Sequence, residues 1–296
     1  MKLLGKRNIF SRMFTLVAVM ILLLPVGCGR RQAQGNALQI KGSDTMVNLG
    51  QAWAEEYMKL YPDMSIAVTG GGSGTGITSM INNTCDIAEV SREMKEEELQ
   101  MARSKGFEPN EIKVALDGLA VVVNPANPVS QLTMEELAAI FTGTIKNWKE
   151  VGGSDEKIVI LSREVNSGTH VYFKEHVLRK GNAKGVEEFA PEALMLSSSQ
   201  AIADEVSQNP AAIGYYGMGY ITAKEKALHI AKDKNSAYVA PTLDNVINNS
   251  YPISRPLLMY TRGTPAGPVK EFIDFVLSPE GQAIVKKIDF VPVKSF

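Results

Sequence analysis

Two sequence patterns alternate along this chain, and that alternation limits the folds open to it. Short apolar runs alternate with segments in which apolar residues recur every three or four positions, beginning near Leu38. The first pattern is typical of buried strands, and the second of helices that pack one face on a sheet. The alternation therefore predicts an α/β fold. We expect strands at residues 38–41, 65–69, 86–90, 113–124, 158–162, 212–216 and 256–261, and helices at 47–60, 74–82, 95–105, 134–141, 169–179, 199–208 and 269–277.

Glycine and small hydroxyl residues gather at three of the predicted strand-to-helix junctions. These junctions are residues 42–46 (GSDTM), 70–76 (GGGSGTG) and 166–169 (NSGT). The start of a helix leaves backbone N–H groups unpaired and carries a partial positive charge, and Ser and Thr hydroxyls add further donors. Three such junctions brought together would enclose one oxyanion.

Helix capping is the alternative explanation for these junctions. Ser, Thr and Asp are preferred N-caps, and glycine is a common turn residue, so capping is the simpler interpretation of any one junction. Arg163 stands four residues before Ser167 in the third junction. Its guanidinium is a planar fork of donors suited to bidentate contact with a phosphate group. The three junctions and this arginine together favour an anion site.

Other phosphate-binding or catalytic motifs do not fit the sequence. Residues 70–76 lack both the Lys-Ser/Thr ending of a nucleotide P-loop and the glycine spacing of a dinucleotide site. The nucleophile pattern G-x-S-x-G is broken around Ser73 and around Ser167. No group of His, Cys and carboxylate residues has metal-ligand spacing, so we expect no metal, no cofactor and no catalytic residue.

The balance of charges argues against nucleic acid as a partner. Lys and Arg together number 31 against 32 Asp and Glu, which gives a formal net charge of −1. Such a chain has no general positive field to hold a polyanion. Recognition of an anion must therefore be local.

The first 28 residues are typical of an export signal. Lys2, Lys6, Arg7 and Arg12 precede an apolar run at residues 13–24, which is short for a membrane-spanning helix. The following LPVGC resembles a lipoprotein cleavage site, so we expect Cys28 to carry the lipid. An uncleaved signal anchor is the alternative.

The segment after Cys28 is expected to be a tether. Residues 29–36 are polar and without periodicity, which suits a link between a lipid anchor and a folded domain. Once Cys28 is lipidated, Cys85 has no cysteine partner, and we expect it to be a buried apolar residue.

Six ordered blocks of the chain resemble the phosphate-binding proteins of Pst-type ABC importers, the PstS family. The resemblance runs from about residue 38 to the C-terminus. The blocks are GSDTM at 42–46, TGGGSGTGI at 69–77, DIAEVSRE at 86–93, LTMEELAAIFTGTIKNW at 132–148, SREVNSGTHVYF at 162–173 and IGYYGMGY at 213–220.

The resemblance implies a two-lobed periplasmic-binding-protein-like fold of type II, with a ligand cleft between two α/β lobes. Residues 37–120 and 253–296 would form the first lobe, and residues 121–252 the second. The chain would cross between the lobes twice, near residues 119–123 and 253–258. Such clefts close by a hinge motion around the ligand.

The resemblance also implies which residues surround phosphate. They are Thr45, the backbone at Met46, Ser73 with nearby N–H groups, Arg163, Ser167, Gly168 and Thr169. Ser43, Asp44, Gly74, Thr75, Ser91 and Arg92, which lie in the matching blocks, complete the predicted phosphate site.

One position departs from the family pattern. The family places a carboxylate in the wall of the first lobe, where it accepts the proton of hydrogen phosphate. In this chain that position falls at Ser91 or Arg92. Asp44 is the nearest alternative acceptor in the three junctions, and capping is an equally good explanation for it.

We therefore expect a monomeric, exported lipoprotein on the outer face of the cytoplasmic membrane or in the periplasm. It would capture inorganic phosphate, deliver it to the permease of an ABC importer and not act as an enzyme. Three alternatives stay open: a binding protein for sulfate, molybdate or another tetrahedral oxyanion, a phosphate-sensing or adhesion module, and a secreted phosphate-ester hydrolase.

Overall fold

The computed structural model describes residues 36–182 and 184–293, in which strands and helices alternate as the sequence predicts. The strands are β1 (Ala37–Gly42), β2 (Ser65–Thr69), β3 (Ile87–Val90), β4 (Pro109–Val123), β5 (Gln131–Thr133), β6 (Val159–Arg163), β7 (Leu194–Leu196), β8 (Ala212–Gly217), β9 (Lys226–Ala227), β10 (His229–Ala231), β11 (Ser254–Arg262) and β12 (Val291–Pro292). The α-helices are α2 (Val47–Leu60), α3 (Ser73–Ile81), α4 (Glu96–Ser104), α5 (Met134–Phe141), α6 (Gly168–Phe173), α7 (Ser199–Gln208), α8 (Leu243–Ile247), α9 (Gly267–Val276) and α10 (Pro279–Lys287). Short 3₁₀-helices lie at η1 (Trp148–Val151) and η3 (Met218–Tyr220), and η2 (Lys174–Leu178) is a π-helix that continues α6.

A mixed sheet connects most of the strands. Its main path runs β2-β1-β3-β11-β4-β8-β6-β7, and β9 and β12 pair with β4 beside that path. The pairs among β1, β2 and β3 and among β6, β7 and β8 are parallel. By contrast, β11 runs antiparallel to β3 and β4, and β4 runs antiparallel to β8. Two parallel groups of strands are thus joined through β11 and β4.

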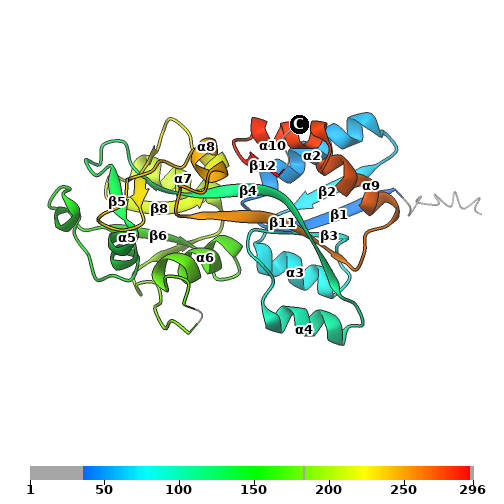
Figure 1. The fold of residues 1–296 in the computed structure, drawn as a ribbon, viewed down its shortest axis with the longest axis horizontal. Helices are drawn as coiled ribbons and strands as arrows, with labels where there is room; N and C mark the ends of the chain where they lie inside the picture. Colours follow the sequence, from blue (N-terminus) through cyan, green and yellow to red (C-terminus); the bar gives the residue numbers. More distant parts are fainter. Residues whose placement is uncertain (1–35, 183, 294–296) are drawn as a thin grey trace, which may run out of the picture. The chain divides into compact units, whose positions relative to one another are not determined.

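The long strand β4 belongs to both lobes of this two-lobed fold. Residues 109–118 of β4 pair with β11, whereas residues 119–123 pair with β8. Figure 1 shows β4 and β11 running side by side from one lobe to the other. The change of partner at Leu119 lies where the first crossover is expected. The lobe boundaries at residues 120/121 and 252/253 stay predictions.

Alternation of side chains along the strands explains why helices cover both faces of each lobe. In β8, Ala212 and Tyr216 pack with α7, whereas Ile213 and Tyr215 belong to the core under α5 and α6. In the other lobe, Figure 1 shows α2, α9 and α10 on one face of the sheet and α3 and α4 on the opposite face. The result is the three-layer arrangement of an α/β protein in each lobe.

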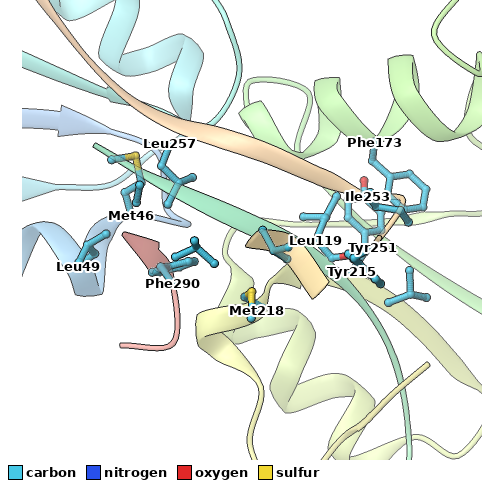
Figure 2. Close-up of a cluster of buried hydrophobic side chains, with 14 of the residues drawn as sticks. Met46, Leu49, Leu119, Phe173, Tyr215, Met218, Tyr251, Ile253, Leu257 and Phe290 are labelled. Carbon is cyan, nitrogen blue, oxygen red and sulfur yellow. The ribbon is translucent and has the colours of Figure 1, made fainter. Parts of the chain in front are cut away.

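One cluster of buried hydrophobic side chains extends through both lobes. It includes Trp53 of α2 and Phe173 of α6, and both are fully buried. Figure 2 shows its middle part, where Leu119 and Met218 lie between Leu257 on one side and Tyr215 on the other. Cys85 is buried in a second cluster beneath α3, as the sequence analysis expects.

The predicted signal peptide (residues 1–28), the lipidation site Cys28 and nearly all of the predicted tether (residues 29–36) lie outside the described residues. Among the residues that are described, no helix has both the length and the apolar character needed to cross a membrane.

Candidate functional site

The three predicted junctions each connect a strand to the helix that follows it. Residues 43–46 join β1 to α2, residues 70–72 join β2 to α3, and residues 164–167 join β6 to α6. Because β1, β2 and β3 are parallel neighbours, their carboxyl ends meet at one edge of the sheet. This edge presents Ser43, Ser73 and Ser91, the last of which follows β3 directly.

Side-chain hydroxyls from these segments lie in direct contact. The hydroxyl of Ser43 donates to Ser91 Oγ at 2.9 Å, and the hydroxyls of Ser73 and Ser91 are 3.3 Å apart. Between the lobes, Thr45 Oγ1 and Thr169 Oγ1 are 2.8 Å apart. All five residues are buried. Buried hydroxyls need partners, and each can donate or accept, so the cluster can adapt to a ligand that does both.

Gly168 allows α6 to approach this cluster closely. A Cβ atom at this position would lie 2.3 Å from Ser73 Oγ and 2.7 Å from Ser91 Oγ, which is closer than atoms can pack. The backbone of the third junction therefore rests on the hydroxyls of the other lobe. Any larger residue here would push the two lobes apart.

Arg163 stands at the end of β6 with its guanidinium buried. It donates to Asp44 Oδ2 at 2.8 Å across the lobes, and to the Ser197 carbonyl at 2.9 Å within its own lobe. Weaker contacts reach Leu196 O at 3.3 Å and Ser199 Oγ at 3.2 Å. Burial lowers the pKa of Arg163, whereas the neighbouring Asp44 carboxylate opposes that shift. A guanidinium nevertheless stays protonated in proteins.

The carboxylate of Asp44 is shared between two donors. Its Oδ2 accepts from Arg163, and its Oδ1 accepts from the backbone N–H of Gly71 at 2.9 Å. Asp44 therefore neutralises Arg163 and fixes the glycine-rich loop at the same time.

A second buried ion pair, Arg255 with Asp117, adjoins the hydroxyls. Arg255 of β11 donates from Nε and Nη2 to Asp117 Oδ2 at 3.0 and 2.9 Å. The same guanidinium reaches Thr169 Oγ1 at 3.0 Å and Thr45 Oγ1 at 3.3 Å. Its Nη1 donates to Ser91 O at 3.0 Å. Arg255 thus contacts groups from both lobes.

Asn166 and Tyr220 add further bonds between the lobes near this cluster. The Asn166 side chain donates to Gly71 O at 2.8 Å, and the backbone carbonyl of Asn166 accepts from Gly74 N at 3.0 Å. The Tyr220 hydroxyl donates to Asp44 O at 2.7 Å. The lobes are therefore in contact over the hydroxyl cluster, as in the closed form of a hinged binding protein.

Comparisons with known proteins identify the family of this chain. The family model of the PBP superfamily domain matches residues 29–280. The phosphate-binding protein PstS of Pseudomonas aeruginosa is 36% identical over 269 residues, which cover 85% of this chain and 81% of that protein. PstS of Bacillus subtilis is 34% identical over 267 residues, which cover 90% of this chain and 83% of that protein. The chain belongs to the PstS family.

Solved structures of the same family have the same fold. A phosphate ABC transporter substrate-binding protein of Clostridium perfringens, crystallised with phosphate, is 36% identical and superposes with a TM-score of 0.78, covering 88% of this chain and 100% of that one. A phosphate transport receptor of Vibrio cholerae is 34% identical, with a TM-score of 0.68, and covers 86% of this chain and 99% of that one. The predicted two-lobed PstS fold is confirmed.

Most of the residues that the PstS resemblance implies lie in or beside the hydroxyl cluster. Met46 is buried at the start of α2, and Gly74 approaches Asn166. Ser167 is a helix cap, because its side chain accepts from the N–H groups of Thr169 and His170. The Thr75 hydroxyl, in the first turn of α3, donates to Gly71 O of the same junction at 2.6 Å. Contact of any of these residues with phosphate stays a prediction.

Arg92 is engaged elsewhere in this PstS-family structure. Its Nη1 and Nη2 atoms donate to the two carboxylate oxygens of Glu98 at 2.8 and 2.7 Å. Glu98 also accepts from Lys95 N at 2.8 Å, so the pair fastens the start of α4. None of the described hydrogen bonds of Arg92 reaches another predicted site residue. Of the two residues at the family's carboxylate position, Ser91 is the one beside the cluster.

Three residues beside the hydroxyl cluster are not predicted from the sequence: Arg255, Asp117 and Asn166. Asp117 lies inside the run at 113–124 that otherwise reads as a buried strand, and Arg255 directly precedes the run at 256–261. A charge in such a place is a signal, because unpaired charges are rarely buried. Their pairing depends on the register of β11 against β4, which is long-range information. Asn166 was visible only as a member of the third junction.

His170 follows the third junction and is buried. Its Nδ1 lies 3.3 Å from Ser162 Oγ, and its ring lies against Phe189. Burial lowers the pKa of His170 to about 4, so the ring is neutral near pH 7. Within the described part of the chain, no three His, Cys, Asp or Glu side chains are grouped as a metal site would require.

Proposed function

We propose that this protein captures inorganic phosphate outside the cytoplasm and delivers it to the permease of an ABC importer. The observation that carries this proposal is the meeting of five buried hydroxyls with the buried guanidinium of Arg255 between the lobes, beside the buried pair of Arg163 and Asp44. Phosphate near neutral pH both accepts hydrogen bonds and donates one, and hydroxyls match both roles. PstS-family relatives are named as phosphate-binding proteins and are not enzymes.

The size of phosphate sets the affinity that we expect. The best small ligands gain about 1.5 kcal/mol for each non-hydrogen atom, so the five atoms of phosphate give roughly 7.5 kcal/mol, which corresponds to a dissociation constant near micromolar. Charge-assisted bonds to Arg163 strengthen binding beyond that value. Calorimetric titration of the full chain in detergent tests the proposal. Binding heat from sulfate or molybdate, with none from phosphate, would show that another oxyanion is the ligand.

Export and attachment to the membrane form the second part of the proposal. The basic residues and apolar run at the N-terminus, followed by Cys28, support a lipoprotein on the outer face of the membrane. Two acyl chains hold a protein on a membrane, whereas one chain does so only weakly. We expect Cys28→Ser to release the protein from the membrane fraction or to stall its processing. Unchanged membrane attachment, with an unmodified Cys28 in mass spectra of the parent, would instead favour an uncleaved signal anchor.

Delivery to an importer predicts a preference for the closed, loaded protein. We expect the cognate permease to bind the protein more tightly with saturating phosphate than without it. Equal binding in both states, or none, would favour a sensing or adhesion module that uses the same capture chemistry.

A further inference from the structure

Arg255 and Asp117 form an ion pair that is withdrawn from solvent completely. Both side chains are 0% exposed. They are direct neighbours across the antiparallel pair of β11 and β4. Asp117 accepts both Arg255 bonds on Oδ2, while its Oδ1 accepts from Met218 N at 3.0 Å. The carboxylate is therefore held by three donors and fixes the direction of the guanidinium.

A buried ion pair of this kind needs a reason beyond stability. The free-energy cost of removing two charges from water offsets much of their mutual attraction. Well-packed apolar residues of similar volume often stabilise a fold as well as a buried ion pair does, or better. Apolar residues flank the pair along both strands: Leu257, Leu258, Leu119 and Val121 are all fully buried. The charged pair therefore points to a role in recognition.

The remaining donors of Arg255 are directed at the hydroxyl cluster. Its Nη2 is within hydrogen-bond distance of Thr45 Oγ1 and Thr169 Oγ1, which are themselves 2.8 Å apart. Its Nη1 donates to Ser91 O and has two hydrogens, so a second bond can form there. Arg255 thus stands where the first lobe, the second lobe and the crossing strand meet.

Arg163 is less free to turn toward a ligand. Its fork is engaged by Asp44, by the carbonyls of Leu196 and Ser197 and by Ser199 Oγ. The two aspartates and two arginines have formal charges that sum to zero. An anion would therefore depend on directed hydrogen bonds rather than on excess positive charge.

We propose that Arg255 is a second anion-binding arginine of this site, and that Asp117 is the residue that positions it. The ligand is a tetrahedral oxyanion, whose oxygens would accept from Nη2 of Arg255 together with Thr45 and Thr169. This inference rests on the proposed phosphate-binding function. It differs from the sequence-based site in that the second guanidinium comes from the crossing strand rather than from a strand-to-helix junction.

Phosphate titration of variants of the full chain in detergent tests the inference. We expect Arg255→Lys to raise the dissociation constant at least tenfold, because a point charge cannot reproduce the fork that spans Asp117 and the threonines. Arg255→Gln should weaken binding further. Arg262 of the same strand is the matched control: it bonds the carbonyls of Met80 and Ile81 and lies over Phe107. Arg262→Lys should bind phosphate within twofold of the parent.

Asp117→Asn distinguishes positioning from simple charge. The variant makes the site more positive, so a purely electrostatic role for the pair predicts tighter phosphate binding. Loss of orientation predicts the opposite, a dissociation constant raised at least fivefold. Circular dichroism and thermal melting establish that each variant is folded. Folded Arg255 and Asp117 variants that bind phosphate within twofold of the parent would overturn the inference.

A measurement on the parent protein covers the case in which the variants do not fold. A crystal structure with phosphate should place Nη1 or Nη2 of Arg255 within hydrogen-bond distance of a phosphate oxygen. Phosphate bound by the junctions without contact to Arg255 would overturn the inference and leave the proposed function intact. A parent that binds no phosphate would overturn both.

Discussion

Asn166 offers a direct test of how closure contributes to binding. Its side chain bonds Gly71 O across the lobes at 2.8 Å, and a weaker contact to Thr75 Oγ1 measures 3.4 Å. Asn166→Ala removes these side-chain contacts but keeps the bond from Gly74 N to the Asn166 carbonyl, which belongs to the backbone. The perturbation therefore removes essentially one hydrogen bond between the lobes.

The expected magnitude follows from that single bond. A neutral hydrogen bond contributes about 1 kcal/mol net, and about 1.4 kcal/mol corresponds to a factor of ten in an equilibrium constant. Only the closed form contains this bond, so its loss should weaken phosphate binding roughly fivefold. Most of the change should appear as faster release, because the bond forms only once the lobes have closed.

Calorimetry gives the affinity and stopped-flow fluorescence gives the release rate. Asn235→Ala, at an exposed position in the turn after β10, is a control that should leave both values unchanged. An Asn166→Ala protein with the affinity and release rate of the parent would show that this contact does not stabilise the loaded form. A loss of more than about fiftyfold would exceed one hydrogen bond and would also contradict the reasoning.

Three further predictions concern groups in or near the site. Arg163→Ala should weaken phosphate binding more than Arg163→Lys does, because only the lysine keeps a charge. Equal affinity of Arg163→Ala and the parent, measured by calorimetry, would remove Arg163 from the site. Asp44→Asn should narrow the preference for phosphate over sulfate in competition titrations, since the amide donates where the carboxylate only accepts. An unchanged ratio of phosphate to sulfate affinity would show that Asp44 only holds Arg163 and Gly71 and does not select the ligand. Glu89 is buried with no hydrogen-bond partner for its Oε1 among the described residues, and burial raises its pKa well above the ordinary 4.5. Between these two pKa values the folded state holds more protons than the unfolded state, so the free energy of unfolding falls as pH rises. Glu89→Gln should therefore be more stable than the parent in urea unfolding at pH 8 but not at pH 4. An equal difference in the free energy of unfolding at both pH values would contradict the raised pKa of Glu89.

Local sequence patterns were sufficient where one face of an element is buried. The predicted helices at 47–60, 134–141 and 199–208 and the predicted strand at 65–69 have the observed limits. In α2, for example, Leu49, Trp53 and Tyr57 recur at helical spacing and are all buried. Periodicity of this kind records burial directly, so no long-range information is needed.

Other elements depend on contacts that the sequence does not show locally. The predicted helix at 169–179 is α6 followed by the π-helix η2, a change of hydrogen-bond register that leaves the apolar pattern nearly intact. The start of β4 is polar and half-exposed, and it is a strand because β11 pairs with it. α10 was overlooked although Ser278 and Pro279 are a typical start signal.

The candidate site divides in the same way. The junctions were predictable because glycine and hydroxyl residues precede helices there, and the structure brings Ser43, Thr45, Ser73 and Thr169 to one place. The partners of the charged residues were not predictable. Arg163 pairs with Asp44 across the lobes, and Arg92 turns to Glu98, because tertiary packing decides which carboxylate each arginine meets.

Calorimetric titration of the full chain in detergent with inorganic phosphate is the most direct test that the two lobes enclose one phosphate. We predict one site per chain, with a dissociation constant near micromolar or tighter, and weaker binding of sulfate under the same conditions. The absence of both a heat signal and a thermal shift at millimolar phosphate would contradict the account, because buried hydroxyls and arginines in this arrangement would then serve only to hold the lobes together.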